Sequence, residues 1–163
     1  MGGRNYGWAA AEVLGANLVA SAFNEYKRNA NFNQISPRGW WHNLQEGFTY
    51  DDNEFRTNQL IHPFNGSIYY NGARANGLGF WSSAGYAIAG AFFWECCGET
   101  HPISLNDTIA TGVGGVAIGE MQFRFASMLL DNAAKGRGRR WREIGAFFID
   151  PIRGLNRVRS GRS

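Results

Sequence analysis

The strongest constraint on the fold is a stretch of twenty residues, 75–94, that carries no charged side chain and is bounded by Arg74 and Glu95. As an α-helix this stretch would be about 30 Å long, which matches the hydrocarbon core of a bilayer. Its glycines and serines are also typical of helices that pack closely against other helices. The stretch therefore predicts either a membrane-embedded helix or a helix buried in a soluble bundle.

A strand is the alternative for the same stretch. Large side chains occupy several even positions between Phe80 and Trp94, and glycine or alanine stands between many of them. This alternation is typical of a strand in a membrane β-barrel. Trp81 and Phe93 interrupt the alternation, so we prefer the helix.

Helical periodicity, capping residues and prolines predict further helices along the chain. Ser104 is a good N-cap, and Pro37 stands where a first helical turn would begin. The predicted helices span residues 6–28, 37–47, 55–74 with an interruption near Pro63, 105–132, and 141–153 split by Pro151. These segments predict an all-α bundle of four or five helices that is membrane-embedded or membrane-associated, with part of a membrane β-barrel as the alternative.

Small residues are concentrated in the predicted helix 105–132. They are Thr111, Gly112, Gly114, Gly115 and Gly119. Each glycine costs a helix up to about 1 kcal/mol relative to alanine. So many in one helix indicate that another helix, or a ligand, approaches closely.

The charge is unevenly distributed. Of a formal net charge of +3, residues 135–163 contribute +7 and residues 1–134 contribute −4. We therefore divide the chain into a helical bundle domain at 1–134 and a basic linker with an amphipathic segment at 135–163. Such a segment can lie on an anionic membrane surface, bind an acidic partner, or simply be solvated. No recognised nucleic-acid module accompanies the basic residues, so we expect no nucleic-acid partner.

Four ionisable side chains form the candidate catalytic set: His62, Glu95, Glu99 and Asp107. Glu95 and Glu99 are four residues apart, so on a helix both carboxylates would point to one place. Buried together, one of them would have a raised pKa. The four residues could then serve as general acid and base, or as ligands of a divalent metal, although the sequence identifies neither a metal nor a cofactor.

A second set of polar residues could line the same pocket if the helices pack antiparallel. These candidate binding residues are Asn58, Tyr70, Arg74, Asn106, Glu120 and Arg124. Purely structural roles are open as well. Asp107 could cap its helix, and Glu120 with Arg124 could form an ion pair across one helical turn. Catalysis, ligand binding without chemistry and a polar packing core are therefore all compatible with the pattern.

A set of motifs resembles an uncharacterised bacterial domain family, over roughly residues 40–158. The motifs are N-Q-x-x-H-P at 58–63, Y-Y at 69–70 with Arg74, W-E-x-x-x-E at 94–99, P-x-S-x-N-D at 102–107, G-G-x-x-x-G-E at 114–120 and I-D-P-x-R-G-x-N-R at 149–157. Members are mostly Gram-negative envelope proteins in which the domain follows a signal peptide and can precede an outer-membrane β-barrel. The resemblance implies the periplasmic side of the envelope, an envelope-protein partner such as that barrel, and no assigned activity. This chain shows neither signal peptide nor barrel, as expected of a fragment or a short member.

A looser resemblance is to the VanZ-like and YfiM-like small helical proteins. They carry a histidine, an acid at the end of a middle helix, and an aspartate before a glycine-rich helix. His62, Glu95 or Glu99, Asp107 and the glycines of 114–119 match in that order. This resemblance implies helices rather than strands.

Three functions follow as expectations. The first is an envelope module that binds lipid, or a lipid-linked envelope component, in a polar pocket between helices. The second is a membrane hydrolase or transferase that acts on a lipid-linked substrate through the four candidate catalytic residues. The third is a structural domain that docks on another subunit through its glycine face.

Overall fold

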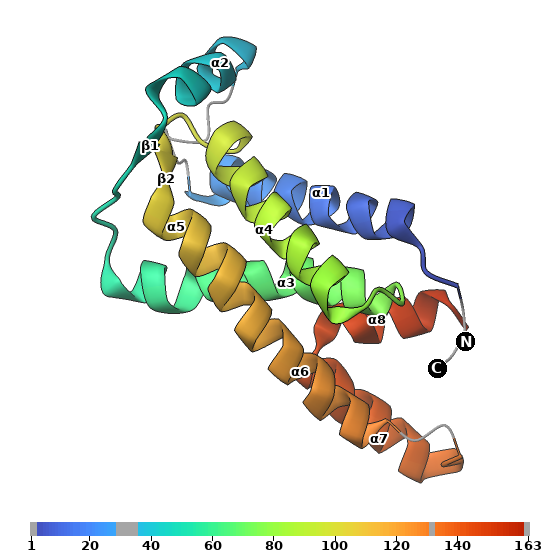
Figure 1. Cartoon of the computed structure of the whole chain (residues 1–163). Coiled ribbons are helices and arrows are strands. Elements are labelled where there is room, and N and C mark those ends of the chain that lie inside the picture. The colour runs from blue at the N-terminus through green and yellow to red at the C-terminus, as the bar shows by residue number, and fades with distance from the viewer. Residues whose placement is uncertain (1–2, 29–35, 131–132, 162–163) are drawn as a thin grey trace.

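The computed structural model describes residues 3–28, 36–130 and 133–161, and nearly all of its regular structure is helical (Figure 1). The helices are α1 (Tyr6–Phe23), continued by the π-helical turn η1 (Asn24–Arg28), α2 (Pro37–Glu46), the π-helical turn η3 (Thr57–Ile61), α3 (His62–Ala75), α4 (Phe80–Cys97), α5 (Leu105–Ile109), the π-helical turn η4 (Ala110–Gly114), α6 (Gly115–Leu129), α7 (Gly136–Ile149) and α8 (Pro151–Arg159). Two short strands, β1 (Phe48–Thr49) and β2 (Ile103–Ser104), pair in parallel. The prediction of an all-α fold is confirmed.

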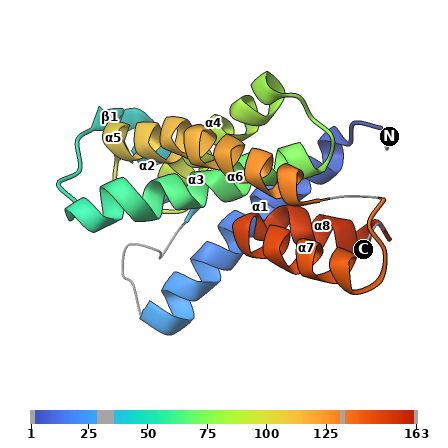
Figure 2. The same cartoon turned by 90° about the horizontal axis from the view of Figure 1, so that it is seen from below.

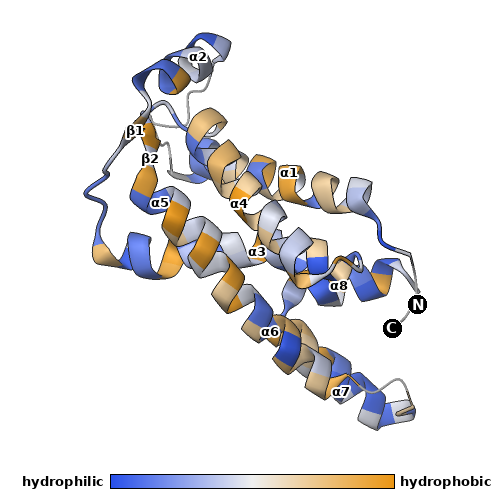
Figure 3. Ribbon diagram, viewed as in Figure 1, coloured by the Kyte–Doolittle hydropathy of each residue, from blue (hydrophilic) through white to orange (hydrophobic). Residues whose placement is uncertain are grey.

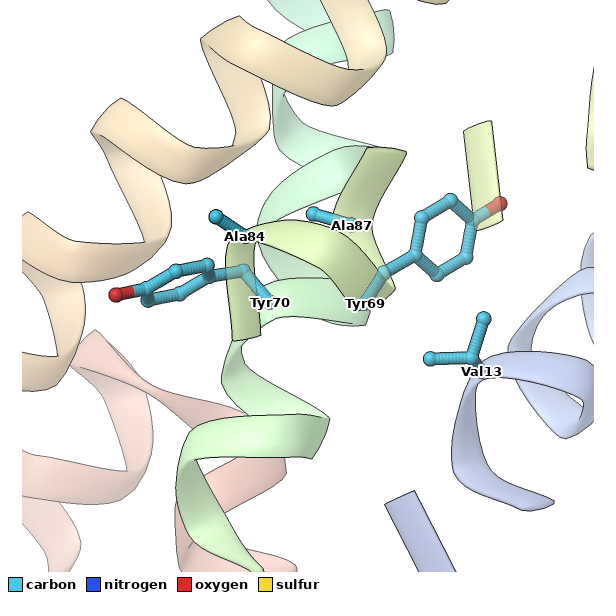
Figure 4. Packing of buried hydrophobic residues seen from close by; sticks show 5 residues of the cluster. All are labelled: Val13, Tyr69, Tyr70, Ala84 and Ala87. Carbon is cyan, nitrogen blue, oxygen red and sulfur yellow. The ribbon is translucent and has the colours of Figure 1, made fainter. Parts of the chain in front are cut away.

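Helix α3 is the centre of the structure, in contact with α1, α4, α6 and α8. Its two adjacent tyrosines point in different directions (Figure 4). Tyr70 points toward α6 and is fully buried, whereas Tyr69 points toward Val13 of α1 and donates a hydrogen bond to Asn17 (2.9 Å). Ala84 and Ala87 of α4 complete this core cluster, and their small side chains let α4 lie close to α3.

The glycines of 112–119 face the chain's own helices. A Cβ atom on Gly66 of α3 would overlap the carbonyl group of Thr111, and one on Gly115 would overlap the backbone of Gly66. A Cβ atom on Gly119 would lie 2.7 Å from the ring of Tyr70. The predicted close helix approach is thus confirmed. Because α3 and α4 cover this face, these glycines serve contacts within the chain, and docking on another subunit through them stays a prediction.

The path into α3 shows how the chain accommodates Pro63. Proline lacks an N–H donor, and its ring collides with the carbonyl group one turn earlier in an ordinary helix. His62 and Pro63 form the first turn of α3. The wider turn η3 lies directly before them. The interruption that the sequence predicts near Pro63 is therefore a change of helical type, and α3 continues unbroken to Ala75.

Helix α4 begins at Phe80, later than predicted, because Asn76 ends α3 and Gly77 turns the chain with a φ of 83°. It continues to Cys97, so the strand alternative for residues 75–94 is wrong. Within the described residues, α4 included, no helix combines the length and the hydropathy needed to cross a membrane.

The C-terminal helices pack on the rest of the chain. Helix α7 begins at Gly136, so most of the predicted linker 135–140 is helical. Asp150 accepts a hydrogen bond from the Arg153 N–H (2.9 Å) and caps α8, which confirms the predicted split at Pro151. Helix α7 contacts α6, and α8 contacts α3. Seen from below, α1, α7 and α8 lie on the same side of the molecule (Figure 2).

We expect Gly66→Ala to destabilise the protein by about 1–3 kcal/mol, because the added methyl group must push α6 away from α3. Chemical denaturation monitored by circular dichroism would measure this loss. Gly85→Ala is the matched control, since nothing lies within 4 Å of a Cβ atom there. That variant should be up to about 1 kcal/mol more stable than the parent, from helix propensity alone. Equal effects of the two substitutions would contradict the glycine contact.

Candidate functional site

The β1–β2 pair joins two segments that the sequence separates by more than fifty residues. Phe48 pairs with Ile103 and Thr49 with Ser104. Beyond the pair, the Asp51 N–H donates to Asn106 Oδ1 (2.9 Å), and Asn106 Nδ2 donates back to the Asp51 carbonyl (3.0 Å). Residues 50–54 are therefore held beside the first turn of α5.

Asp107 is the buried centre of this region, with 2% of its surface exposed. Its two carboxylate oxygens accept hydrogen bonds from Asn106 Nδ2 (3.1 Å) and from Asn53 Nδ2 (3.0 Å). Its N–H donates to Ser104 Oγ (3.2 Å), so Ser104 is the N-cap of α5, as predicted. The Asp107 side chain is therefore not the cap of the helix, and it faces His62 of α3.

His62 faces Asp107 and Thr111 from the start of α3. Its Nδ1 lies 3.0 Å from Thr111 Oγ1, and its Nε2 lies 3.6 Å from Asp107 Oδ2. Asp107 and Thr111 are four residues apart on α5 and η4, so both reach one imidazole. Burial lowers the pKa of His62, and the carboxylates of Asp107 and Asp51 oppose this effect only in part. The imidazole is therefore neutral at pH 7.

Glu95 and Glu99 lie close together, but not on one helical face. Helix α4 ends at Cys97, and Glu99 lies beyond it, where it accepts a hydrogen bond from Trp94 Nε1 (2.7 Å). Glu95 is 2% exposed and accepts one from the Ser104 N–H (3.3 Å). Burial, with repulsion from Glu99 next in size, raises the pKa of Glu95 to about 9. Burial also raises the pKa of Glu99, so the predicted raised pKa is confirmed in direction.

Helix α2 fixes the loop that carries Glu99. Asn43 is fully buried, and its Nδ2 donates to the carbonyl groups of Cys96 (3.3 Å) and Glu99 (3.0 Å). Trp40 Nε1 donates to the Cys97 carbonyl (2.9 Å). The last carbonyl groups of a helix have no partner within it, and these two side chains supply partners for α4.

An open groove of about 1410 Å³ runs from this polar region along the molecule. Its polar end is lined by Asp51, Asn53, His62, Glu99 and His101. Its walls further along include apolar side chains from α1, α3 and α8: Ala16, Val19, Ala20, Phe23, Ile68, Ile152 and Leu155. Glu12 of α1 and Asn156 and Arg159 of α8 line the groove as well, so it has a second polar region between these two helices. Glu95, Asn106 and Asp107 lie behind the groove wall. Of the four candidate catalytic residues, only His62 and Glu99 line the groove.

The predicted binding residues divide into two places. Asn58 donates to the Asn53 carbonyl (3.2 Å), and Asn106 binds Asp51, so both support the polar end of the groove without lining it. The other four form a separate cluster around Glu120, which accepts hydrogen bonds from Tyr70 (2.6 Å), Arg74 (3.1 Å) and Arg124 (2.8 Å). Tyr70 lies two turns along α3 from His62, roughly 12 Å by helical rise. None of these four lines the groove, so the prediction of one common pocket is wrong for them.

A match to a known family covers most of this region. The family described as Domain of unknown function (DUF3943) matches residues 47–152. The chain belongs to the DUF3943 family. This confirms the resemblance to an uncharacterised domain family, whereas the likeness to VanZ-like and YfiM-like proteins finds no support. No curated protein and no solved structure matches the chain.

The DUF3943 region contains the whole polar end of the groove. Helix α1 and most of α8 lie outside the matched residues, and both contribute apolar wall. The sequence did not identify Asp51, Asn53 or Thr111 as site residues. They come close to Asp107 and His62 only when the chain is folded. Among the described residues, no three His, Cys, Asp or Glu side chains are grouped so as to hold a metal ion.

We expect Glu95→Gln to change how stability depends on pH. The folded-state pKa of Glu95, about 9, lies above its ordinary value of 4.5. The protonated carboxyl group therefore makes its full contribution to the free energy of unfolding below pH 4.5. This contribution is lost as the pH rises toward 9, by at most about 1.4 kcal/mol per pH unit. Glutamine imitates the protonated form and does not ionise. The variant should therefore lose less stability than the parent between pH 5 and pH 9 in urea denaturation series, and parallel curves would contradict the raised pKa.

Proposed function

We propose that this protein binds a lipid, or a lipid-linked envelope component, with its tail along the apolar walls of the groove and its head group at the polar end. The observation that carries the proposal is the groove itself, which is open, about 1410 Å³ in volume, and combines a long apolar stretch with the polar end around His62 and Glu99. Typical pockets for small molecules have volumes of roughly 300–1000 Å³. A groove that exceeds this range and has a long apolar stretch beside a polar end suits a long amphiphile.

The walls match a hydrocarbon tail. Ala16 and Ala20 lie on one face of α1 and leave space beside α3, while Val19, Phe23 and Leu155 supply apolar surface. Val19 is 70% exposed and Leu155 is 57% exposed, so much of their apolar surface is in contact with water. Covering them with a tail would gain roughly 25 cal/mol for each Å² of apolar surface removed from water.

The polar end favours a head group that donates hydrogen bonds. Asp51 and Glu99 contribute carboxyl groups, and His62 contributes a neutral imidazole. Hydroxyl and ammonium groups match these side chains, whereas a terminal phosphate would bring further negative charge toward Asp51. The proposed ligand is therefore a membrane lipid or lipid-linked molecule with an amine or hydroxyl head group. The motif resemblance supports the periplasmic side of the bacterial envelope as its location and other envelope proteins as partners.

We expect Ala20→Trp to block the tail site and weaken binding of a fluorescent fatty-acyl probe by at least about tenfold, which corresponds to 1.4 kcal/mol. Leu18→Trp is the control, because Leu18 is 70% exposed on the same helix but does not line the groove. Probe titration and native mass spectrometry of co-purified lipid would measure both variants. Loss of binding in neither variant, or in both, would exclude the groove as the site.

A second function is favoured by one observation: His62 lines the groove, and its two ring nitrogens lie 3.0 Å from Thr111 Oγ1 and 3.6 Å from Asp107 Oδ2. A neutral histidine oriented by a carboxylate can act as a general base. In this alternative the protein is a hydrolase or transferase of a lipid-linked substrate, with His62 and Glu99 at the substrate and Asp107 holding the imidazole in place.

We expect His62→Gln to abolish any hydrolysis of long-chain acyl esters by the purified protein while leaving probe binding within about threefold, a difference below 1 kcal/mol. Release of the alcohol from a chromogenic ester would measure turnover. If the parent protein releases no alcohol above the uncatalysed rate, or if His62→Gln does so at the parental rate, the enzymatic alternative is wrong.

A further inference from the structure

The outward face of α7 carries a stripe of large apolar side chains. Arg139, Glu143 and Ala146 form the inward face, where Ala146 is 4% exposed. On the opposite face, Trp141, Ile144 and Phe148 recur at intervals of three and four residues, which places them in one row. They are 70%, 45% and 77% exposed. Trp141 and Phe148 are largely uncovered by the described chain, whereas Ile144 also lines a pocket of about 320 Å³ between α7 and α8.

The row is surrounded by positive charge. Lys135, Arg137, Arg140 and Arg142 are all exposed. The sole acid in residues 135–149 is Glu143, and it is engaged by Arg139 (3.0 Å) and Arg157 (3.3 Å). Figure 3 shows hydrophilic and hydrophobic residues interleaved along α7. The outward side of α7 is therefore cationic at its flanks and apolar at its centre.

We infer that this face of α7 binds the surface of an anionic lipid bilayer. Arginines beside a row of tryptophan, isoleucine and phenylalanine are typical of helices that lie in the plane of a membrane interface. The apolar row would enter the acyl boundary while the arginines contact anionic head groups. An acidic protein or a nucleic acid would satisfy the arginines and leave Trp141 and Phe148 in water, so the bilayer is the better match.

The location of α7 connects this surface to the groove. Helix α7 packs against α8, and Ile152 and Leu155 of α8 line the groove. The proposed membrane surface and one apolar wall of the groove therefore lie on helices that pack against each other. The inference goes beyond the proposed groove ligand, because α7 can bind a membrane whatever the groove holds.

Cosedimentation of the whole chain with vesicles tests the inference. We expect binding to vesicles of equal parts phosphatidylcholine and phosphatidylglycerol, and much weaker binding to phosphatidylcholine alone. The triple variant Arg137→Gln, Arg140→Gln, Arg142→Gln should bind the anionic vesicles more weakly by on the order of a hundredfold, at about 1 kcal/mol for each arginine. The double variant Trp141→Ser, Phe148→Ser should lose at least about tenfold.

Trp81→Ser is the matched control, because Trp81 is 84% exposed on α4, outside the proposed surface. It should bind as the parent does. All variants change exposed side chains, and circular dichroism would verify that each is folded. Equal binding to both vesicle types, no binding by the folded parent, or equal losses in Trp81→Ser and the α7 variants would overturn the inference. An acidic protein partner is supported only if vesicle binding is absent.

Discussion

The close approach of α3 and α6 is the contact on which the other features depend. Gly66 and Gly115 meet backbone to backbone, and no side chain fits between them. Because Thr111 and Asp107 precede Gly115 on one continuous helical path, this contact also determines their distance from His62. The polar end of the groove is thus built on the same glycine contact that forms the core, and a shift of α6 would disturb both.

Several carboxyl groups are buried near the polar end of the groove, and each is either hydrogen-bonded or protonated. Isolated buried carboxylates are costly unless they are neutralised or hydrogen-bonded. Asp107 receives amide donors from Asn53 and Asn106. Glu95 instead keeps its proton, since its pKa is raised to about 9. The result is a region rich in oxygen atoms to which Glu95 adds no negative charge at pH 7, next to an apolar groove.

The sequence predicted the helices better than the tertiary contacts between them. Local signals at Pro37, Ser104 and Pro151 predicted helix boundaries, and the glycines of 112–119 predicted a close helix contact. The pairing of β1 with β2 has no periodic signal, because each strand is two residues long. It is this pair that brings Asp51 to Asn106. The single predicted pocket failed because Tyr70 lies two turns along α3 from His62 and binds Glu120 of α6 there, outside the groove. The sequence pattern does not show how far apart such residues lie along packed helices.

The groove is built from helices at opposite ends of the chain, and this affects the order in which its contacts form during synthesis. Glu12 of α1 accepts a hydrogen bond from Asn156 of α8, 144 residues away in sequence. During synthesis α1 is made before α3 and α4, which cover part of its apolar face, and its contact with α8 forms last. Until then the residues that α1 turns toward α8 are exposed, and exposed apolar surface favours aggregation of a nascent chain. An amphiphile bound in the groove would cover this surface earlier and act as a folding template.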